Sequence, residues 1–322
     1  MITQPATQEL PSISPDTEPY VARKQSHSEF LVLRGVRYHV RRWGPDCAPL
    51  VVMVHGWLDM SASYQFIVDA LSSNWRIVAP DWSGFGLSGC RDGTYGYADY
   101  LADLDALLDY YSPVAPAYAL IGHSLGGNTA GMYAGIRPDR IQRLITMEGF
   151  GPVPPMSGEF ERKRVLSWLD GLKTGGRRTI YPDKRQFATR LLKQNPRLGA
   201  DRALFLAEAF ARPAGDGFEF AADPVHQRVL GQPRVGGNFY KACWSQVTGP
   251  ALWVAANQSH QMRAYMKHEE GREFYRAALE SFRDVREVLI DDASHNLHHD
   301  QPVKVAQAIE SFLRTTTVAA PT

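Results

Sequence analysis

The segment with the clearest chemical signal is Gly122–Gly126, which reads Gly-His-Ser-Leu-Gly. It follows the apolar run Ala117–Ile121 and opens a helical pattern that continues to Ile136. A serine on so sharp a strand-to-helix turn has a strained backbone, and side chains two residues to either side would crowd it. The turn lifts the hydroxyl above the sheet edge, beside a helix N-terminus that favours developing negative charge. Ser124 is therefore predicted to be a nucleophile; the alternative is a glycine-rich turn with an idle serine.

A serine nucleophile needs a general base, and histidines gather near the C-terminal end of the chain. His295, His298 and His299 follow the apolar run Val285–Ile290 and precede a helical pattern at Pro302–Leu313. A neutral imidazole near pH 7 can take the serine proton and return it to the leaving group. A carboxylate must then orient that imidazole. The residues alone leave open which histidine is the base.

Four motifs in succession resemble signatures of the α/β-hydrolase superfamily. Besides Gly122–Gly127, they are His55-Gly56-Trp57 after the run Leu50–Val54, Asp81–Ser88 after the run Arg76–Pro80, and Ser294–Pro302. The resemblance covers about Val32 to Leu313 and looks closest to capped esterases and the serine hydrolase-like group. It implies an α/β-hydrolase fold and a serine mechanism that needs no metal ion or cofactor.

The resemblance also implies individual roles. The backbone amides of Trp57 and Leu125 would form an oxyanion hole, in which each donor can contribute roughly 3 to 4 kcal/mol. The catalytic histidine comes first in its loop, which selects His295 and leaves the later histidines and Asp300 in supporting or packing roles. Asp81 is expected to serve the structure. Supporting positions around the nucleophile and the oxyanion turn are His55, Gly56, Gly122, His123 and Gly126.

The acidic member of the triad departs from the usual pattern. Most of the superfamily carries it after the strand that corresponds to Ala251–Ala256, and here that place falls on Ser259, which cannot do the task. Glu148 is predicted instead, because it ends the run Arg143–Met147 and parallel strands end together at one edge of a sheet. Haloalkane dehalogenases are among the families that carry their acid after this strand. The alternatives are a solvated or salt-bridged Glu148, and as other acids Asp291, Asp292 and Asp223.

The elements that must position these residues alternate along the chain. Short apolar runs separated by helical patterns, such as Tyr97–Tyr110, predict a mostly parallel sheet covered by helices on both faces. The alternation stops at residues 151–249, where helical patterns predict a cap over the carboxyl edge of the sheet. An independent helical domain is the alternative. The expected organisation is a disordered lead at 1–25, a core at 26–150 and 250–316, and the cap at 151–249. The apolar runs are Val36–Val40, Leu50–Val54, Arg76–Pro80, Ala117–Ile121, Arg143–Met147, Ala251–Ala256 and Val285–Ile290.

Composition narrows the remaining possibilities. A formal net charge of +1 over 322 residues provides no field that would attract nucleic acid. The three cysteines lie far apart and indicate neither a disulfide framework nor a zinc site. The polar N-terminal stretch lacks the pattern of a signal peptide, and no apolar run is long enough to span a bilayer. A cytoplasmic protein without integral membrane contact is expected, although export by another route stays open.

These observations predict a serine-dependent carboxylic ester hydrolase. It would cleave an ester, or a related acyl bond, of a small and largely apolar substrate through an acyl-enzyme. Aspartate-nucleophile relatives are disfavoured because a serine stands at position 124. The expected partner is a small-molecule ester, with no nucleic acid, and a homodimer stays open. The two rival functions are an acyltransferase on the same fold and a non-catalytic sensor of a small ligand.

Overall fold

The computed structural model describes residues 13–151, 158–174, 178–226 and 235–315. Within them, contacts divide the chain into two compact units. Of the described residues, those within 1–21 and 178–220 form the smaller unit, and those within 22–177 and 221–322 form the larger one.

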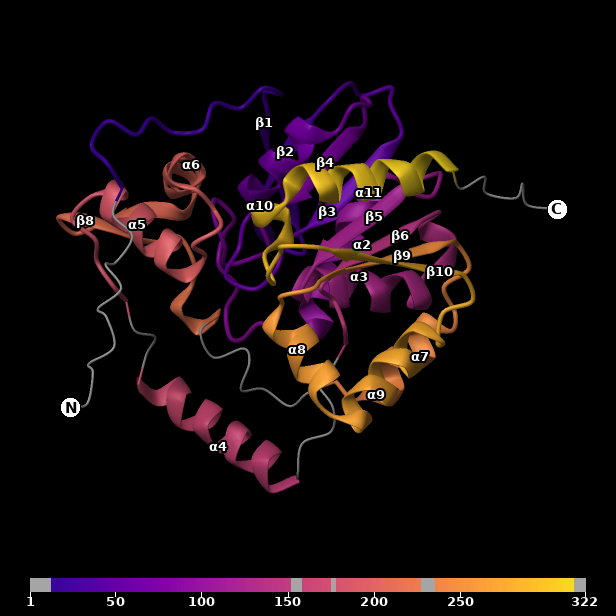
Figure 1. The fold of residues 1–322 in the computed structure, drawn as a ribbon. Coiled ribbons are helices and arrows are strands. Elements are labelled where there is room, and N and C mark those ends of the chain that lie inside the picture. The colour runs from indigo at the N-terminus through magenta and orange to yellow at the C-terminus, as the bar shows by residue number, and fades with distance from the viewer. Residues whose placement is uncertain (1–12, 152–157, 175–177, 227–234, 316–322) are drawn as a thin grey trace, which may run out of the picture. The chain divides into compact units, whose positions relative to one another are not determined.

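An eight-stranded sheet forms the centre of the larger unit, in the order β1-β2-β4-β3-β5-β6-β9-β10 (Figure 1). β1 and β2 form an antiparallel hairpin and β2 pairs antiparallel with β4, whereas all later pairings are parallel. The strands are β1 (His27–Leu33), β2 (Val36–Trp43), β3 (Leu50–Val54), β4 (Arg76–Pro80), β5 (Ala119–His123), β6 (Leu144–Met147), β9 (Ala251–Ala256) and β10 (Val285–Ile290). The predicted α/β fold is confirmed, and each predicted run lies on a strand. The edge strand β1 was not predicted, because its outer half is polar and exposed.

The central strands are apolar along their whole length because helices cover both faces of the sheet. Every residue of β3, β5, β6 and β9 is buried. One face packs against α1 and α11, whose Ile67, Val305 and Ile309 share a core with β-strand residues. On the other face α3 lies against β5 and β6, with α2 and α7 beside it. The helices are α1 (Gln65–Ala70), α2 (Tyr97–Tyr111), α3 (Leu125–Ile136), α4 (Gly158–Thr174), α7 (Gly237–Trp244), α8 (His260–Lys267), α9 (Glu269–Leu279), α10 (Leu297–Asp300) and α11 (Pro302–Thr315), with 3-10 turns η1 (Ser61–Tyr64) and η2 (Pro138–Arg140).

The smaller unit consists of two helices and a hairpin: α5 (Lys184–Gln194), α6 (Ala200–Phe210), β7 (Ala211–Ala214) and β8 (Gly217–Phe220). Phe187 of α5 is fully buried and stacks on Phe220 with ring centroids 6.1 Å apart. The helices occur where the sequence patterns place them, whereas the hairpin was not predicted. The proposed cap boundaries at 151 and 249 stay a prediction.

Part of the predicted N-terminal lead lies within the smaller unit. Arg185 donates to the carbonyl oxygen of Ser14 at 2.6 Å, and the ring of Tyr20 packs edge-on against Phe205. Residues 1–12 lie outside the described part of the chain.

Helices that could cross a bilayer, being both long and apolar enough, do not occur in the described part of the chain.

Candidate active site

Ser124 occupies a strained turn between β5 and α3. Its backbone has φ 52° and ψ −113°, a conformation that residues other than glycine rarely adopt. The flanking glycines make this turn sterically feasible. A Cβ on Gly122 would lie 2.3 Å from the carbonyl oxygen of Gly126, and one on Gly126 would lie 2.1 Å from that of Val54. The turn therefore tolerates no larger residue at either position.

Three side chains from separate loops form one hydrogen-bonded chain. Ser124 Oγ lies 2.9 Å from His295 Nε2, and His295 Nδ1 lies 3.1 Å from Glu148 Oε2. Ser124 follows β5, Glu148 follows the adjacent strand β6, and His295 lies in the loop after β10. The structure thus brings together the three residues predicted as nucleophile, acid and base.

Glu148 is held by the backbone of neighbouring strands. The side chain is only 1% exposed, and the residue has a positive φ of 55°. Its own amide donates to Val254 at 2.9 Å, while its Oε1 accepts from the amide of Ala256 at 2.8 Å. Oε2 is left to face His295. Both carboxylate oxygens are therefore engaged, and the side chain has one available orientation.

This arrangement determines the tautomer of the histidine. A carboxylate only accepts, so Nδ1 of His295 carries the hydrogen and donates to Glu148. In the neutral ring, Nε2 then presents its lone pair to the Ser124 hydroxyl, which donates. This geometry allows the imidazole to accept the serine proton.

The two amides predicted for the oxyanion hole lie on either side of the nucleophile in sequence. Leu125, which carries one of these N–H groups, is the first residue of α3, and Trp57, which carries the other, follows the His55-Gly56 turn. Within residues 13–151, 158–174, 178–226 and 235–315, neither N–H donates to another protein group. Their role in binding an oxyanion stays a prediction.

The predicted supporting residues hold these loops in place. His55 accepts from the amide of Trp82 at 2.9 Å and donates to the carbonyl oxygen of Gly56 at 2.8 Å. Burial lowers its pKa, so the ring is neutral. A Cβ on Gly56 would lie 2.8 Å from the ring of His123, so only glycine fits there. His123 in turn donates through Nε2 to the carbonyl oxygen of His295 at 2.8 Å.

The alternative acids and bases have other structural roles. Ser259 caps α8 by accepting from the amides of Gln261 and Met262. Asp300 accepts from the amide and the hydroxyl of Ser294, which fixes the histidine loop. Three of the remaining candidates contact residues outside the triad: Asp291 with Asn257, Asp223 with Tyr95, and His298 with Ser63.

Asp81 has the structural role expected for it. The carboxylate accepts from His39 at 2.7 Å and from the amides of Ser61 and Leu87. Burial opposes its ionisation, but the hydrogen bonds from His39 and from Ser61 lower its pKa to about 2. Asp81 therefore joins the second motif to η1.

Sequence reasoning missed His226, which holds Trp57. Its ring is stacked between those of Phe85 and Tyr95, each 3.8 Å away, and its carbonyl oxygen accepts from the Trp57 indole at 2.8 Å. Burial lowers the pKa of His226 to about 4. It lies 169 residues from Trp57 and outside every motif, so no local signal could have identified it.

Comparisons with known proteins agree with this fold. A family model described as alpha/beta hydrolase fold matches residues 49–302, and the chain belongs to this family. A serine hydrolase-like protein of Danio rerio is 30% identical over 188 residues, which cover 56% of this chain and 57% of that protein. The chain thus spans just over half of that relative. The AB hydrolase superfamily protein YfhM of Bacillus subtilis (strain 168) is 25% identical, with 89% of this chain and 97% of that protein covered.

A solved structure is similar over most of the chain. The thioesterase domain from the curacin biosynthetic pathway superposes with a TM-score of 0.75 and 23% identity, covering 89% of this chain and 99% of that domain. At this identity the likeness concerns the fold alone.

Proposed function

We propose that the protein is a serine-dependent hydrolase that cleaves a carboxylic ester, or a related acyl bond, of a small and largely apolar substrate. The observation that carries the proposal is the continuous hydrogen-bonded chain from Glu148 through His295 to Ser124. Membership of the alpha/beta hydrolase family supports it, as does the similarity to the serine hydrolase-like protein of Danio rerio.

In the first half of the reaction, Ser124 Oγ attacks the acyl carbon while its proton passes to His295 Nε2. The carbonyl oxygen becomes an oxyanion, for which the amides of Trp57 and Leu125 are the proposed donors. The tetrahedral intermediate collapses, the bond to the leaving group breaks, and His295 returns the proton to the departing oxygen. The acyl group remains on Ser124 as an ester.

In the second half, water replaces the leaving group. His295 takes a proton from the water, the hydroxide attacks the acyl carbon, and the carboxylic acid departs as Ser124 recovers its proton. Glu148 stabilises the imidazolium in both halves through its hydrogen bond to Nδ1.

Hydrolysis of p-nitrophenyl acetate, butyrate and octanoate by the purified chain tests the proposal, with Ser124→Ala as the matched control. Turnover that disappears in Ser124→Ala is expected, with a preference among chain lengths that measures the acyl pocket. Equal rates for the two proteins would refute the assigned nucleophile. Addition of a primary alcohol separates hydrolysis from transfer, because an acyltransferase would form a new ester at the expense of free acid.

A further inference from the structure

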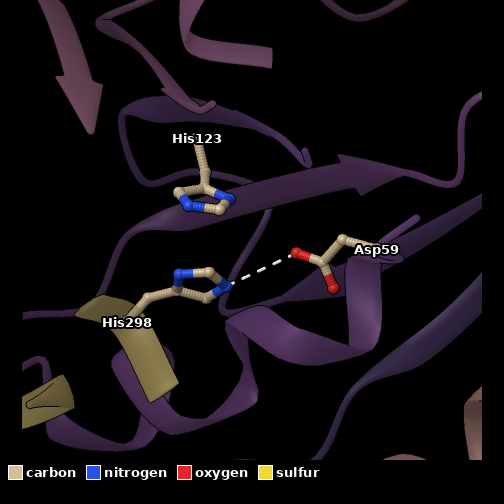
Figure 2. Close-up of side chains that lie close together, drawn as sticks. All are labelled: Asp59, His123 and His298. Carbon is tan, nitrogen blue, oxygen red and sulfur yellow. Dashed lines mark ion pairs between the residues drawn. The ribbon is translucent and has the colours of Figure 1, made fainter. Parts of the chain in front are cut away.

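A second polar cluster lies behind the triad, formed by Asp59, His123 and His298. Each contributes one potential metal-ligand atom, and these atoms all lie within 4.8 Å of one another. The side chains come from three separate segments and face one common point (Figure 2). Their exposed fractions are 7%, 2% and 0%, so bulk water does not solvate the cluster.

His123 presents an unused lone pair to this cluster. Its Nε2 lies 2.8 Å from the carbonyl oxygen of His295, which only accepts, so Nε2 carries the hydrogen. In the neutral ring, a hydrogen on Nε2 leaves a lone pair on Nδ1. Nδ1 is therefore an acceptor, and this buried atom has no hydrogen-bond partner among the described residues. A histidine whose far nitrogen donates to a backbone carbonyl has the tautomer and orientation typical of a metal ligand.

Asp59 and His298 are spaced as ligands rather than as a close ion pair. Their Oδ2 and Nε2 atoms lie 3.4 Å apart, longer than the 2.7 to 2.9 Å or so of a charge-assisted hydrogen bond. Two ligands of a tetrahedral zinc ion, each at about 2.0 to 2.1 Å from the metal, are separated by about 3.3 Å. The hydroxyl of Ser63 lies 2.9 Å from Asp59 Oδ2 and 3.4 Å from His298 Nε2. The Ser63 hydroxyl, which donates to Asp59, therefore lies next to both of these atoms.

We propose that Asp59, His123 and His298 bind one divalent zinc ion, with Ser63 as a neutral fourth donor. Two imidazoles and one carboxylate form a ligand set that binds zinc and leaves a fourth position for another donor. The side chain of Asp59 is 10% exposed and is the most accessible of the three ligands. The composition of the sequence predicted no zinc site, because the ligands are 64 or more residues apart and form no compact motif.

The ion would join the three loops that carry the proposed catalytic groups. Asp59 lies two residues after Trp57, His123 directly precedes Ser124, and His298 lies three residues after His295. A single bound ion thus stabilises the relative positions of these loops without contacting substrate. This binding proposal does not depend on the proposed hydrolase activity.

Zinc binding by the full chain tests the proposal directly. The protein is produced in zinc-supplemented medium and dialysed against metal-free buffer, and its zinc content is measured by inductively coupled plasma mass spectrometry. The stripped protein is then titrated with zinc chloride and its melting temperature followed. We expect about one zinc per chain, and a melting temperature that rises on addition of zinc.

Variants separate this site from other histidines. His298→Gln and Asp59→Asn should weaken zinc binding by at least about 100-fold, more than the loss of an outer-shell partner. His299→Gln alters the neighbouring residue on α10 and should retain binding. His295→Ala should also retain it, which excludes the triad as the zinc site. Circular dichroism identifies any variant that fails to fold. If a variant does not fold, the wild-type protein is loaded with cobalt instead and its visible absorption spectrum is measured. We expect the spectrum of a tetrahedral site with nitrogen and oxygen ligands.

Three results would overturn the proposal. One is a wild-type chain that retains far less than one zinc and shows no thermal shift. Another is zinc binding that His295→Ala abolishes while His298→Gln does not. The third is a cobalt spectrum typical of an octahedral site. Such a spectrum would mean that cobalt binds at the protein surface, and that a buried water or direct hydrogen bonds satisfy the polar atoms of the cluster.

Discussion

Replacing Glu148 with glutamine should leave the fold intact and nearly abolish turnover. The substitution changes one oxygen into an amide nitrogen, with no change in size. The side chain has two contacts: Oε1 accepts from the amide of Ala256 at 2.8 Å, and Oε2 faces His295 Nδ1 at 3.1 Å. The amide of Ala256 is part of a buried strand and can only donate. The glutamine oxygen must therefore face Ala256, and its NH₂ group must face His295.

That orientation forces the histidine into the wrong tautomer. With an N–H donor opposite Nδ1, the neutral ring must place its own hydrogen on Nε2, where it meets the Ser124 hydroxyl. The base then has no lone pair for the serine proton. Loss of the correct tautomer in a serine triad lowers kcat by about 10⁴, equivalent to roughly 5 kcal/mol of transition-state stabilisation. We expect a fall of about 10³- to 10⁴-fold in kcat, with KM changed far less.

The assay is the initial rate of p-nitrophenyl butyrate hydrolysis for wild type, Glu148→Gln and Ser259→Ala, with melting temperatures measured in parallel. Ser259 occupies the place where most of the superfamily carries its acid, but here it caps α8, so its loss should cost only about 1 kcal/mol of stability. Turnover of Glu148→Gln within a few-fold of wild type would refute the assignment. A large loss in Ser259→Ala at unchanged stability would indicate a different acid.

Three further predictions concern the loops around the triad. Gly126→Ala should destabilise the protein by about 3 kcal/mol or more, because the new Cβ would lie 2.1 Å from the carbonyl oxygen of Val54. In thermal unfolding, Gly236→Ala should cost only about 1 kcal/mol, because its methyl meets open space and alanine is merely a poorer N-cap for α7. Trp57→Phe removes the indole bond to His226 and should lower kcat about 5- to 10-fold with KM nearly constant; an unchanged kcat would show that this bond does not position the loop. Burial lowers the pKa of His226 to about 4, so as the pH falls this histidine binds a proton in the unfolded chain before it does so in the folded protein. Its contribution to the free energy of unfolding is therefore fully present above about pH 6.5. Below that pH it decreases by up to about 1.4 kcal/mol per pH unit until about pH 4. Urea unfolding at pH 7.5 and pH 5 should show a smaller difference for His226→Gln than for wild type, and equal differences would contradict a neutral buried ring.

The turn that carries Ser124 could be predicted because its determinants are local. Gly122 and Gly126 are required by contacts within the turn and with the end of β3, and the apolar residues before Ser124 identify the strand. The same holds for the central strands, whose uninterrupted apolar runs reflect burial on both faces. β1 was missed because its exposed polar half hides the strand pattern.

The acid could be predicted only from strand order. Glu148 directly follows β6, the strand adjacent to that of the nucleophile, so it reaches the same edge of the sheet as Ser124. The sequence carries no information on the distance to His295 or on the Ala256 amide that orients the carboxylate. Both depend on the register of β6 against β9, which is set by packing across the whole sheet.

Residue types, the order of the motifs and the glycines of the nucleophile turn were determined by the sequence itself, because each depends on neighbours within a few positions. Only the tertiary structure decided that His226 holds Trp57 and that Asp59, His123 and His298 converge. These contacts join segments up to 239 residues apart, from Asp59 to His298. Such contacts arise when the sheet and its covering helices pack as a unit, so a short sequence pattern cannot predict them.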